Sequence, residues 1–382
     1  MGREHPARMG HPGPSVTRPS APPIYQTTAF DVPDLDVLQA MYAGVQPGDV
    51  YTRDSNPNQT ALAAAIAELE GTEAGAVFAS GMGAAGSIFL SLAGSGDHVI
   101  VARSLYGKTL QLASRMGQLG VSISQFDVSD PSQLSGLLTE RTRFVLVETI
   151  SNPLLEVADL EEVVRHAGGV PVVVDSTFTT PELVRPCALG AAIVYHSASK
   201  YLNGHGDVML GVAAGSRELM RRLQETSSIF GQNANPFESW LTMRGLRTLP
   251  LRMRQICETA RRLAEYLSGH SGVGYYPLLE GHPSRGRAER LYPGGTGGIV
   301  SFELCGGGFE AVSGLMRRLC GIPFSPTLAD ARTTISHPAT TSHRFLSASE
   351  RRSLGIADEL IRVSVGLEPF ELLAGEFGAA LG

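Results

Sequence analysis

Short apolar runs alternate with amphipathic stretches through the middle of the chain. This alternation is typical of strands and helices that follow one another in βαβ order. Because the apolar runs carry no polar face, we expect a largely parallel sheet that helices cover on both sides, which is an α/β core. The predicted strands are 76–79, 98–102, 144–147, 170–174, 193–195 and 208–212, and the predicted helices include 59–69, 84–92 and 160–166.

The pattern changes after Trp240. A long amphipathic helix at 251–268 precedes strands near 298–303 and 360–364, which predicts a smaller C-terminal α+β domain. Residues 1 to about 21 are rich in glycine, proline, arginine and histidine and predict a flexible arm, followed by an extended segment. We therefore divide the chain into an arm with its extended segment (1–50), a large domain (51–245) and a small domain (246–382).

Charge and cysteine content narrow the class of protein. A net charge of −6 gives no reason to expect nucleic acid or an anionic membrane as a partner. No apolar run approaches the length that spans a bilayer, and the N-terminus lacks the apolar stretch of a secretory signal, so we expect no membrane association. The four cysteines show no short paired spacing, which fits a reducing, cytoplasmic location and predicts no metal site.

Lysine is rare here. Of the 31 basic side chains only Lys108 and Lys200 are lysines. An amine can lose its proton and attack a carbonyl carbon, whereas a guanidinium stays protonated and unreactive. Lys200 is therefore the first candidate for a catalytic centre, and the alternative is a surface residue left over from coding bias.

Polar residues follow four of the predicted strands directly. In open α/β sheets, ligands bind beyond the carboxyl ends of the strands, so these residues are candidates for one shared site. The helix that opens after the first strand also offers free backbone amides to a phosphate. The strand-end residues are Ser80, Gly81 and Met82; Glu148 and Asn152; Asp175; and Ser197, Ser199 and Lys200.

A lysine, a carboxylate and a phosphate cradle together match the needs of pyridoxal 5'-phosphate. The lysine would hold the cofactor aldehyde. Asp175 would keep the pyridine nitrogen protonated, and the amides and hydroxyls would bind the phosphate. A distant alternative is a nicotinamide oxidoreductase, because Gly81, Gly83 and Gly86 match a dinucleotide-binding pattern. That match lacks the acidic residue about 20 positions downstream that would bind the ribose.

The motifs around these residues resemble one known family. Asp175-Ser-Thr-Phe-Thr-Thr-Pro181 and Ser197-Ala-Ser-Lys-Tyr-Leu-Asn-Gly-His-Gly-Asp207 closely resemble the signature of the Cys/Met-metabolism pyridoxal phosphate enzymes, the cystathionine γ-synthase and γ-lyase group. The resemblance runs from Pro22 almost to the C-terminus. It also covers Tyr51-Thr-Arg-Asp-Ser-Asn-Pro57, Glu148-Thr-Ile-Ser-Asn-Pro153 and Ile361-Arg-Val-Ser-Val-Gly-Leu-Glu368.

The resemblance implies an aspartate-aminotransferase-like fold, fold type I, and a homotetramer built from two catalytic dimers. Tyr51 and Arg53 would bind the cofactor phosphate of the neighbouring subunit. Tyr106 would stack on the pyridine ring, and Asn152 and Arg362 would bind the substrate carboxylate. By the same resemblance the cofactor site comprises Ser80, Gly81, Met82, Tyr106, Asp175, Thr177, Ser197, Ser199 and Lys200, with Thr327 at the substrate end. We add Lys108 at the substrate end as a separate hypothesis, because it is one of only two lysines; the alternative is a solvent-facing lysine at the start of a helix.

Three positions depart from the family pattern. Ser176 stands where asparagine is common, and Lys108 where glycine or cysteine is usual. Thr327-Leu-Ala-Asp330 aligns with Ser-Leu-Gly-Gly. The positions 327–330 lie at the substrate end of the family's site, so the identity of the amino-acid substrate stays open.

The resemblance implies chemistry at the γ-carbon of an amino acid, with Lys200 carrying protons between substrate carbons. We expect γ-replacement on an activated homoserine, which would join it to cysteine, sulfide or another nucleophile. The alternative is γ- or β-lyase action on cystathionine, methionine or a related amino acid. An aminotransferase and an inactive homologue are more distant alternatives.

Overall fold

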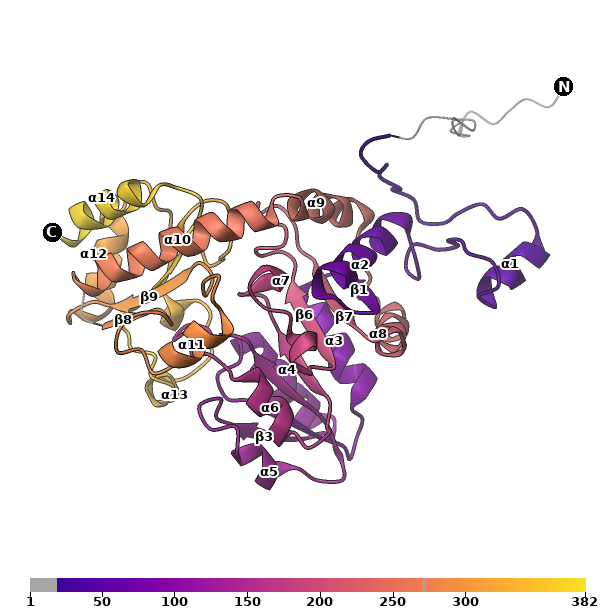
Figure 1. Ribbon diagram of the computed structural model, residues 1–382, viewed down its shortest axis with the longest axis horizontal. Helices are drawn as coiled ribbons and strands as arrows, with labels where there is room; N and C mark the ends of the chain where they lie inside the picture. The colour runs from indigo at the N-terminus through magenta and orange to yellow at the C-terminus, as the bar shows by residue number, and fades with distance from the viewer. Residues whose placement is uncertain (1–18, 271–272) are drawn as a thin grey trace.

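The computed structural model describes residues 19–270 and 273–382, and within them two sheets organise the chain (Figure 1). The larger sheet has the order β1-β7-β6-β5-β4-β2-β3. Neighbouring strands from β3 through β6 are parallel, and β7 is antiparallel to both β6 and β1. The predicted α/β class with a largely parallel sheet is confirmed. The strands are β1 (Ala74–Phe78), β2 (His98–Ala102), β3 (Ser122–Phe126), β4 (Thr142–Glu148), β5 (Val172–Asp175), β6 (Ile193–Ser197) and β7 (Gly211–Gly215).

Helices cover both faces of this sheet because alternate strand residues point to opposite sides. Val77 and Val212 pack in one buried cluster with α2 (Pro57–Glu70), whereas Phe78 packs in the other with α3 (Gly81–Leu92). Strands with two apolar faces are therefore buried from both sides. The remaining helices of this part are α4 (Gly107–Gln118), α5 (Gln133–Leu137), α6 (Leu160–His166), α7 (Thr180–Leu183), η1 (Pro186–Leu189), α8 (Arg217–Phe230) and α9 (Pro236–Leu246).

The last strand of the large sheet begins later than predicted. Periodicity indicated 208–212, but β7 is Gly211–Gly215. Val208 and Leu210 are buried in the chain that returns from the Lys200 turn, and their burial mimics that of a strand. A side chain at Gly211 would bring Cβ to 2.1 Å from the Ser80 carbonyl oxygen, so small residues let the strand pack beside the start of α3.

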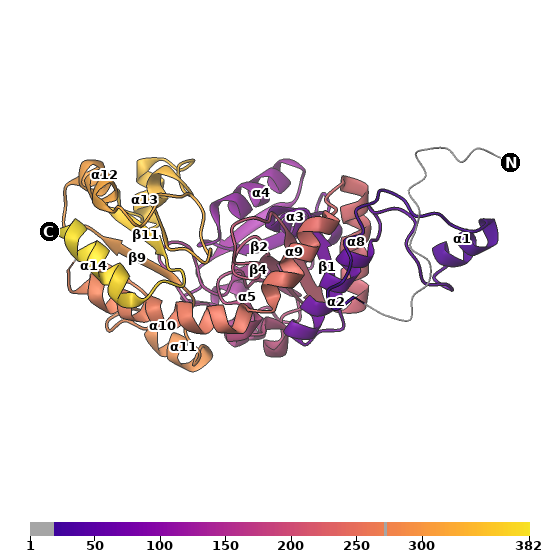
Figure 2. The same cartoon turned by 90° about the horizontal axis from the view of Figure 1, so that it is seen from above.

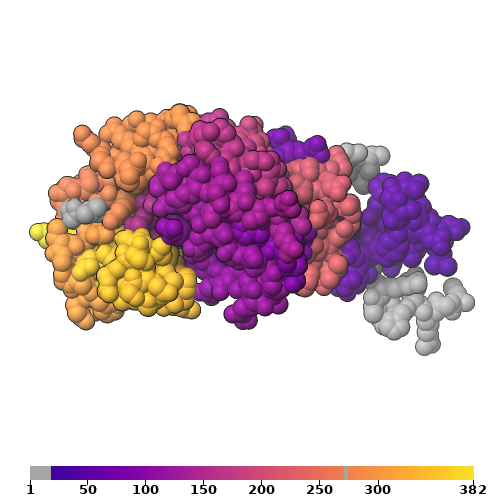
Figure 3. Space-filling model, turned by 90° about the horizontal axis from the view of Figure 1, so that it is seen from below, coloured from indigo at the N-terminus to yellow at the C-terminus, as the bar shows by residue number. Residues whose placement is uncertain are grey.

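The smaller sheet is antiparallel, in the order β10-β11-β9-β8. It forms the C-terminal α+β part that the sequence predicted, although the short strands β8 and β10 escaped prediction. In Figure 3 this part, coloured orange to yellow, packs directly against the magenta and purple surface of the large-sheet part. Its elements are β8 (Val273–Tyr275), α11 (Arg285–Leu291), β9 (Ile299–Glu303), α12 (Gly308–Arg318), β10 (Thr334–Ser336), η2 (Pro338–Thr340), α13 (Ala348–Ser353), β11 (Leu360–Ser364) and α14 (Phe370–Leu381).

One long helix, α10 (Leu249–Ser268), runs from the large-sheet part to the small-sheet part (Figures 1 and 2). Pro250 in its first turn suits a helix start, because the missing N–H would have had no partner there. Met253, Ile256 and Leu263 bury its apolar face in the same core cluster as the small sheet. The helix thus forms a continuous structural link between the two parts.

The N-terminal segment lies outside this core. Residues 22–30, which were predicted to be extended, contain no helix. Beyond them Asp34 caps a helix that was not predicted, α1 (Leu35–Tyr42), by accepting a 2.8 Å hydrogen bond from the Val37 amide. The attachment of the segment to α2 is polar, since the Tyr25 amide donates to Asn58 Oδ1 at 2.8 Å. Most of the predicted flexible arm falls in residues 1–18, outside the described part, and the division at residues 50 and 245 stays a prediction. None of the described helices is long and apolar enough to cross a bilayer.

Candidate active site

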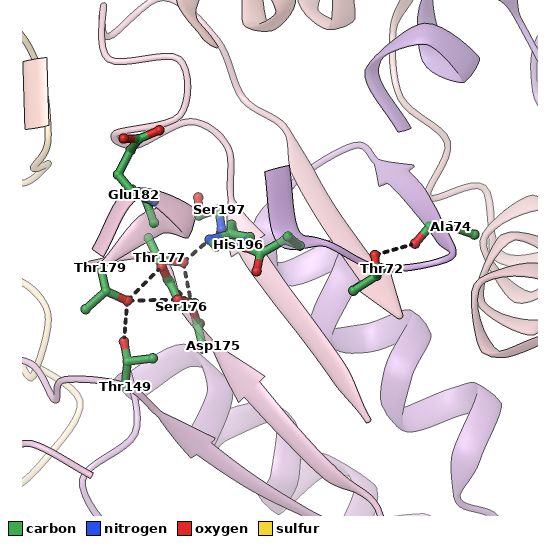
Figure 4. A network of polar contacts seen from close by, with 12 residues as sticks. Thr72, Ala74, Thr149, Asp175, Ser176, Thr177, Thr179, Glu182, His196 and Ser197 are labelled. Carbon is green, nitrogen blue, oxygen red and sulfur yellow. Dashed lines mark hydrogen bonds and ion pairs between the residues drawn. The ribbon is translucent and has the colours of Figure 1, made fainter. Parts of the chain in front are cut away.

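The carboxyl ends of β4, β5 and β6 place Glu148, Asp175 and Ser197 at one edge of the large sheet. Glu148 and Asp175 face each other in register, and Asp175 pairs with Tyr195 on the other side. In Figure 4, Asp175, Thr177 and Ser197 lie close together where their strands end. Three of the strand-end residues that the sequence singled out, Glu148, Asp175 and Ser197, therefore converge.

Hydrogen bonds hold the Asp175 carboxyl in one orientation. Its Oδ1 accepts from the Thr177 amide at 3.0 Å and from the Thr177 hydroxyl at 2.5 Å. The same hydroxyl accepts from the Ser197 amide at 2.9 Å, which connects β5 to β6. Burial raises the pKa of Asp175, and the bonds from Thr177 partly oppose that rise.

The side chain of Ser176, a position that departs from the family pattern, points into the core. Its hydroxyl lies 2.8 Å from Thr179 Oγ1, and Thr179 in turn lies 2.9 Å from Thr149 Oγ1. All three side chains are fully buried, and Figure 4 shows them as a separate cluster beside Asp175. The serine is thus part of the core under the site.

Glu148 is a site residue that sequence reasoning did not assign a role. Its Oε1 accepts a 2.6 Å hydrogen bond from the backbone amide of Tyr106. Burial and the neighbouring charge of Asp175 raise the pKa of Glu148 well above its ordinary value. The signals in the sequence were its position directly after the apolar run of β4 and its place at the start of a motif shared with the resembled family.

The two carboxyls fit a cationic ring nitrogen. Neither Glu148 nor Asp175 forms an ion pair with a basic side chain in the described residues, although they lie side by side. Two such groups at one edge favour a positive charge between or near them. A protonated pyridine nitrogen would supply that charge, so this edge of the site fits pyridoxal phosphate.

The start of α3 forms a cradle for a phosphate. Ser80 caps the helix by accepting from the Gly83 amide at 2.9 Å, which leaves the amides of Gly81 and Met82 without acceptors inside the helix. A Cβ at Gly81 would lie 2.8 Å from the Ser197 Cβ and would fill the cradle. Backbone amides at a helix N-terminus, with hydroxyls beside them, suit a phosphate dianion.

Ser199 takes a different place from Ser197. Its hydroxyl donates to the Leu210 carbonyl at 3.3 Å and accepts from the Leu210 amide at 2.9 Å. Ser199 therefore fastens the chain that leads into β7. Its predicted role in binding the phosphate stays a prediction.

Lys200 follows β6 in a turn and reaches toward the small-sheet part. Its Nζ donates to Thr327 Oγ1 at 3.0 Å. Burial, with a smaller contribution from the charge of Arg362, lowers the pKa of Lys200 to about 8. An amine with that pKa loses its proton far more readily than an ordinary lysine does.

Arg362 on β11 brings a buried cation, 3% exposed, to the same place. Its Nη1 donates to Asn152 Oδ1 at 3.0 Å, and its Nη2 donates to the Thr327 carbonyl at 3.3 Å. Its Nε is buried without a hydrogen-bond partner in the described residues. A carboxylate would accept from such a fork in a bidentate manner.

The neighbours of Arg362 in the small sheet support this arrangement. Ser301 pairs with Arg362 in register, and its hydroxyl donates to the Pro153 carbonyl at 2.8 Å. Asn152 and Pro153 belong to the large-sheet part, so two adjacent strands of the small sheet hold one loop of the other. Asn152, Thr327 and Arg362 are therefore brought together as predicted from the resemblance.

Tyr106 and Lys108 lie at the start of α4. The Tyr106 side chain is 37% exposed, and burial of its hydroxyl end raises its pKa, so the phenol stays protonated at neutral pH. Lys108 is exposed, and its Nζ donates to Gln111 Oε1 at 2.9 Å along its own helix. The structure thus gives Lys108 a partner on the surface, and its tentative role at the substrate end stays a prediction.

Tyr51 and Arg53 are exposed in the segment before α2. The Arg53 guanidinium lies 5.0 Å from the centre of the Tyr51 ring. Within the described residues no contact joins either side chain to Lys200 or to the cradle at α3. Their predicted function in a neighbouring subunit is consistent with this exposure and stays a prediction.

Known proteins resemble the chain over nearly its whole length. The profile of a family described as "Cys/Met metabolism PLP-dependent enzyme" matches residues 7–382. L-methionine gamma-lyase from Pseudomonas putida is 40% identical over 369 residues, which cover 94% of this chain and 92% of that protein. O-succinylhomoserine sulfhydrylase from Pseudomonas aeruginosa is 39% identical over 363 residues, which cover 94% of this chain and 90% of that protein.

A solved structure of a related enzyme has the same fold as this chain. The crystal structure of cystathionine gamma synthase from Xanthomonas oryzae pv. oryzae, in complex with aminoacrylate and cysteine, superposes with a TM-score of 0.88 at 35% identity. The match covers 94% of this chain and 92% of that chain. The predicted fold type I is confirmed, and the nicotinamide alternative has no support.

Proposed function

The chain belongs to the Cys/Met metabolism PLP-dependent enzymes, and on that premise we propose that it catalyses γ-replacement on an activated homoserine, with a thiol or sulfide as the nucleophile. The observation that carries the proposal is the meeting of Lys200, Thr327 and Arg362 at one point. An amine able to move protons there lies next to a cation able to hold an amino-acid carboxylate.

Pyridoxal phosphate, when bound, supplies a sink for the negative charge that develops on the substrate α-carbon. Lys200 would hold the cofactor aldehyde. Its Nζ would also accept the proton from the substrate α-carbon and return protons at neighbouring carbons. Its pKa of about 8 suits both directions of transfer near neutral pH.

Arg362 and Asn152 would orient the substrate. The guanidinium would bind the α-carboxylate through its free N–H groups, while the Asn152 amide keeps the fork in place. Fixing the carboxylate directs the α-hydrogen toward Lys200, and such orientation accounts for a large share of catalysis. Asp175 and Glu148 would hold the ring, and Gly81, Met82 and Ser197 would hold the phosphate.

The relatives support chemistry at the γ-carbon but include two types of reaction, replacement and elimination. O-succinylhomoserine sulfhydrylase and cystathionine gamma synthase carry the names of replacement enzymes, and these support our proposal. Methionine gamma-lyase carries the name of an elimination enzyme and is equally similar. Elimination from methionine or cystathionine is therefore the second candidate, and it would use the same residues.

Product analysis separates the two candidates. O-acetyl- and O-succinyl-homoserine are incubated with cysteine or sulfide, and methionine and cystathionine are incubated alone, with Lys200→Ala as the inactive control. γ-Replacement predicts a thioether or thiol amino acid as the main product. If a 2-oxo acid is the main product even when the nucleophile is abundant, the enzyme is a lyase and our proposal is wrong.

The active unit would be a pair of chains, and two such pairs would form a homotetramer. Tyr51 and Arg53 would reach the phosphate of the neighbouring copy, because in their own chain they contact nothing in the cradle. The N-terminal segment, drawn in indigo, projects from the rest of the molecule in Figure 3 and exposes apolar side chains that a second copy would cover. These side chains include Ile24, Tyr25, Leu35, Tyr42 and Val45.

We also place the enzyme in the cytoplasm. All four cysteines are free, and two of them, Cys305 and Cys320, are exposed, as suits a reducing compartment. The substrate is a small amino acid, and the site needs no nucleic acid or membrane.

A further inference from the structure

Arg252 is a buried cation in an unusual position. It is only 4% exposed and forms no ion pair with a carboxylate in the described residues. It also lies in the first turn of α10, where a positive charge opposes the helix dipole. Burial lowers the pKa of Arg252 to about 10, so it remains charged at neutral pH. A charge held at such cost needs specific hydrogen bonds.

Two of the four hydrogen bonds that Arg252 donates reach the turn that carries Lys200, and its Nε donates to Thr248 Oγ1 at 3.1 Å. Nη1 donates to the Tyr201 carbonyl at 2.6 Å, and Nη2 donates to the Leu202 carbonyl at 3.2 Å. Nη2 also donates to the Gly245 carbonyl at 2.9 Å, at the end of α9. Two of the three accepting carbonyls thus belong to the residues directly after the lysine.

No backbone amide of the described residues donates to these two carbonyls. The turn closes when the Asn203 amide donates to the Ala198 carbonyl and the Gly204 amide donates to the Lys200 carbonyl. The next carbonyls find no amide because the chain turns away at Gly204, whose φ is +73°. A Cβ at Gly204 would lie 2.0 Å from Arg252 Nη1, so only glycine leaves room for the guanidinium. Arg252 therefore ends the turn in the manner of a C-terminal cap.

We propose that Arg252 is a positioning residue for Lys200: its guanidinium fixes the backbone turn from which the lysine reaches Thr327. The inference rests on the function proposed above, in which Lys200 holds the cofactor. Arg252 lies on α10, which packs against β9, the strand beside Arg362. One helix therefore sets the lysine and the carboxylate-binding arginine in a fixed relation.

The test compares Arg252→Met and Arg252→Lys with Arg254→Met, an exposed arginine two residues along the same helix. The measurements are the visible absorbance of the lysine-bound cofactor as a function of pH, kcat and KM, and the melting temperature. Arg252→Met should shift the pH midpoint of the absorbance and lower kcat roughly tenfold or more, with a much smaller change in KM. Arg252→Lys should recover part of kcat, since an ammonium keeps the charge but loses the fork.

Arg254→Met should match the wild type in all three measurements. If Arg252→Met melts earlier but keeps the wild-type absorbance titration and kcat at a temperature where it is folded, Arg252 serves the fold alone and the proposal is wrong. If Arg252→Met does not fold, the absorbance titration and kcat of Arg252→Lys decide instead. Wild-type values of both in the folded Arg252→Lys variant would then contradict the proposal. A wild-type enzyme whose cofactor is not attached to Lys200 would instead refute the proposed function.

Discussion

Glu148 and Asp175 lie directly opposite each other at the ends of the adjacent parallel strands β4 and β5. Like charges at this spacing repel, and burial adds to the cost of ionising both. Of the two, only Asp175 accepts two hydrogen bonds from one residue, Thr177: one from its amide and one from its hydroxyl. These bonds favour the charged form of Asp175. We therefore expect Asp175 to carry the charge at neutral pH and Glu148 to hold the proton.

Glu148→Gln should stabilise the apoenzyme at neutral and higher pH. A carboxyl whose pKa is raised by folding binds more protons when folded, so its contribution to stability is greatest at low pH and is lost as the pH rises through the folded pKa. The gain in melting temperature should be roughly 2 °C or more at pH 8 and should vanish below about pH 4.5. Exposed Glu68→Gln is the control.

The measurement is thermal unfolding of both variants across pH, with and without cofactor. The cofactor should reduce the gain, because its ring cation compensates the carboxyl charge. A gain that does not depend on pH would show that Glu148 is not titrating in this way.

Arg362→Lys should weaken binding of the amino acid. Lysine keeps the charge but cannot donate to Asn152, the Thr327 carbonyl and a substrate carboxylate with one planar fork. KM should rise by roughly tenfold or more, while cofactor absorbance stays normal. Arg332→Lys, at an exposed arginine, is the matched control. An unchanged KM would exclude the proposed contact with the carboxylate.

The identity of the site could be predicted from the sequence far better than its geometry. Lys200 was found because lysine is scarce in this chain, and Asp175 because it ends an apolar strand; parallel strands bring such ends together. Glu148 met the same criterion, but its pairing with Asp175 depends on strand register, which periodicity does not reveal. The bond from Lys200 to Thr327 depends on how two separate sheets pack, over 127 positions of sequence, and no local pattern encodes that.

Two inactive subunits should restore activity when they are mixed. A Lys200→Ala chain keeps Tyr51 and Arg53, and an Arg53→Ala chain keeps its lysine, so a mixed pair contains one complete site. Activity should reach about a quarter of the wild-type value for random exchange, since half of the pairs are mixed and each has one intact site. Exchange itself is followed by a tag on one chain. Confirmed exchange without any recovery would contradict the shared site.

Lys108→Met should change substrate preference without changing cofactor absorbance. If the ammonium attracts an anionic group of the substrate, its removal should lower kcat/KM for O-succinyl-homoserine roughly threefold or more relative to O-acetyl-homoserine. Gln111→Met breaks the same side-chain hydrogen bond and leaves the charge, so it serves as the control. Equal kinetics of Lys108→Met and wild type on both esters would leave Lys108 a surface residue.

Asn152 and Arg362, which would bind the substrate carboxylate, come from the large-sheet part and the small-sheet part. This separation in the sequence has a consequence during synthesis. Chains emerge from the ribosome N-terminus first, and domains tend to fold as they appear. Every residue assigned to the cofactor precedes β7 in the sequence, whereas Arg362 lies close to the C-terminus. A nascent chain therefore contains all of its proposed cofactor residues well before it contains the arginine proposed to bind the substrate carboxylate, so the capacity to hold a substrate is the last part of the site to be synthesised.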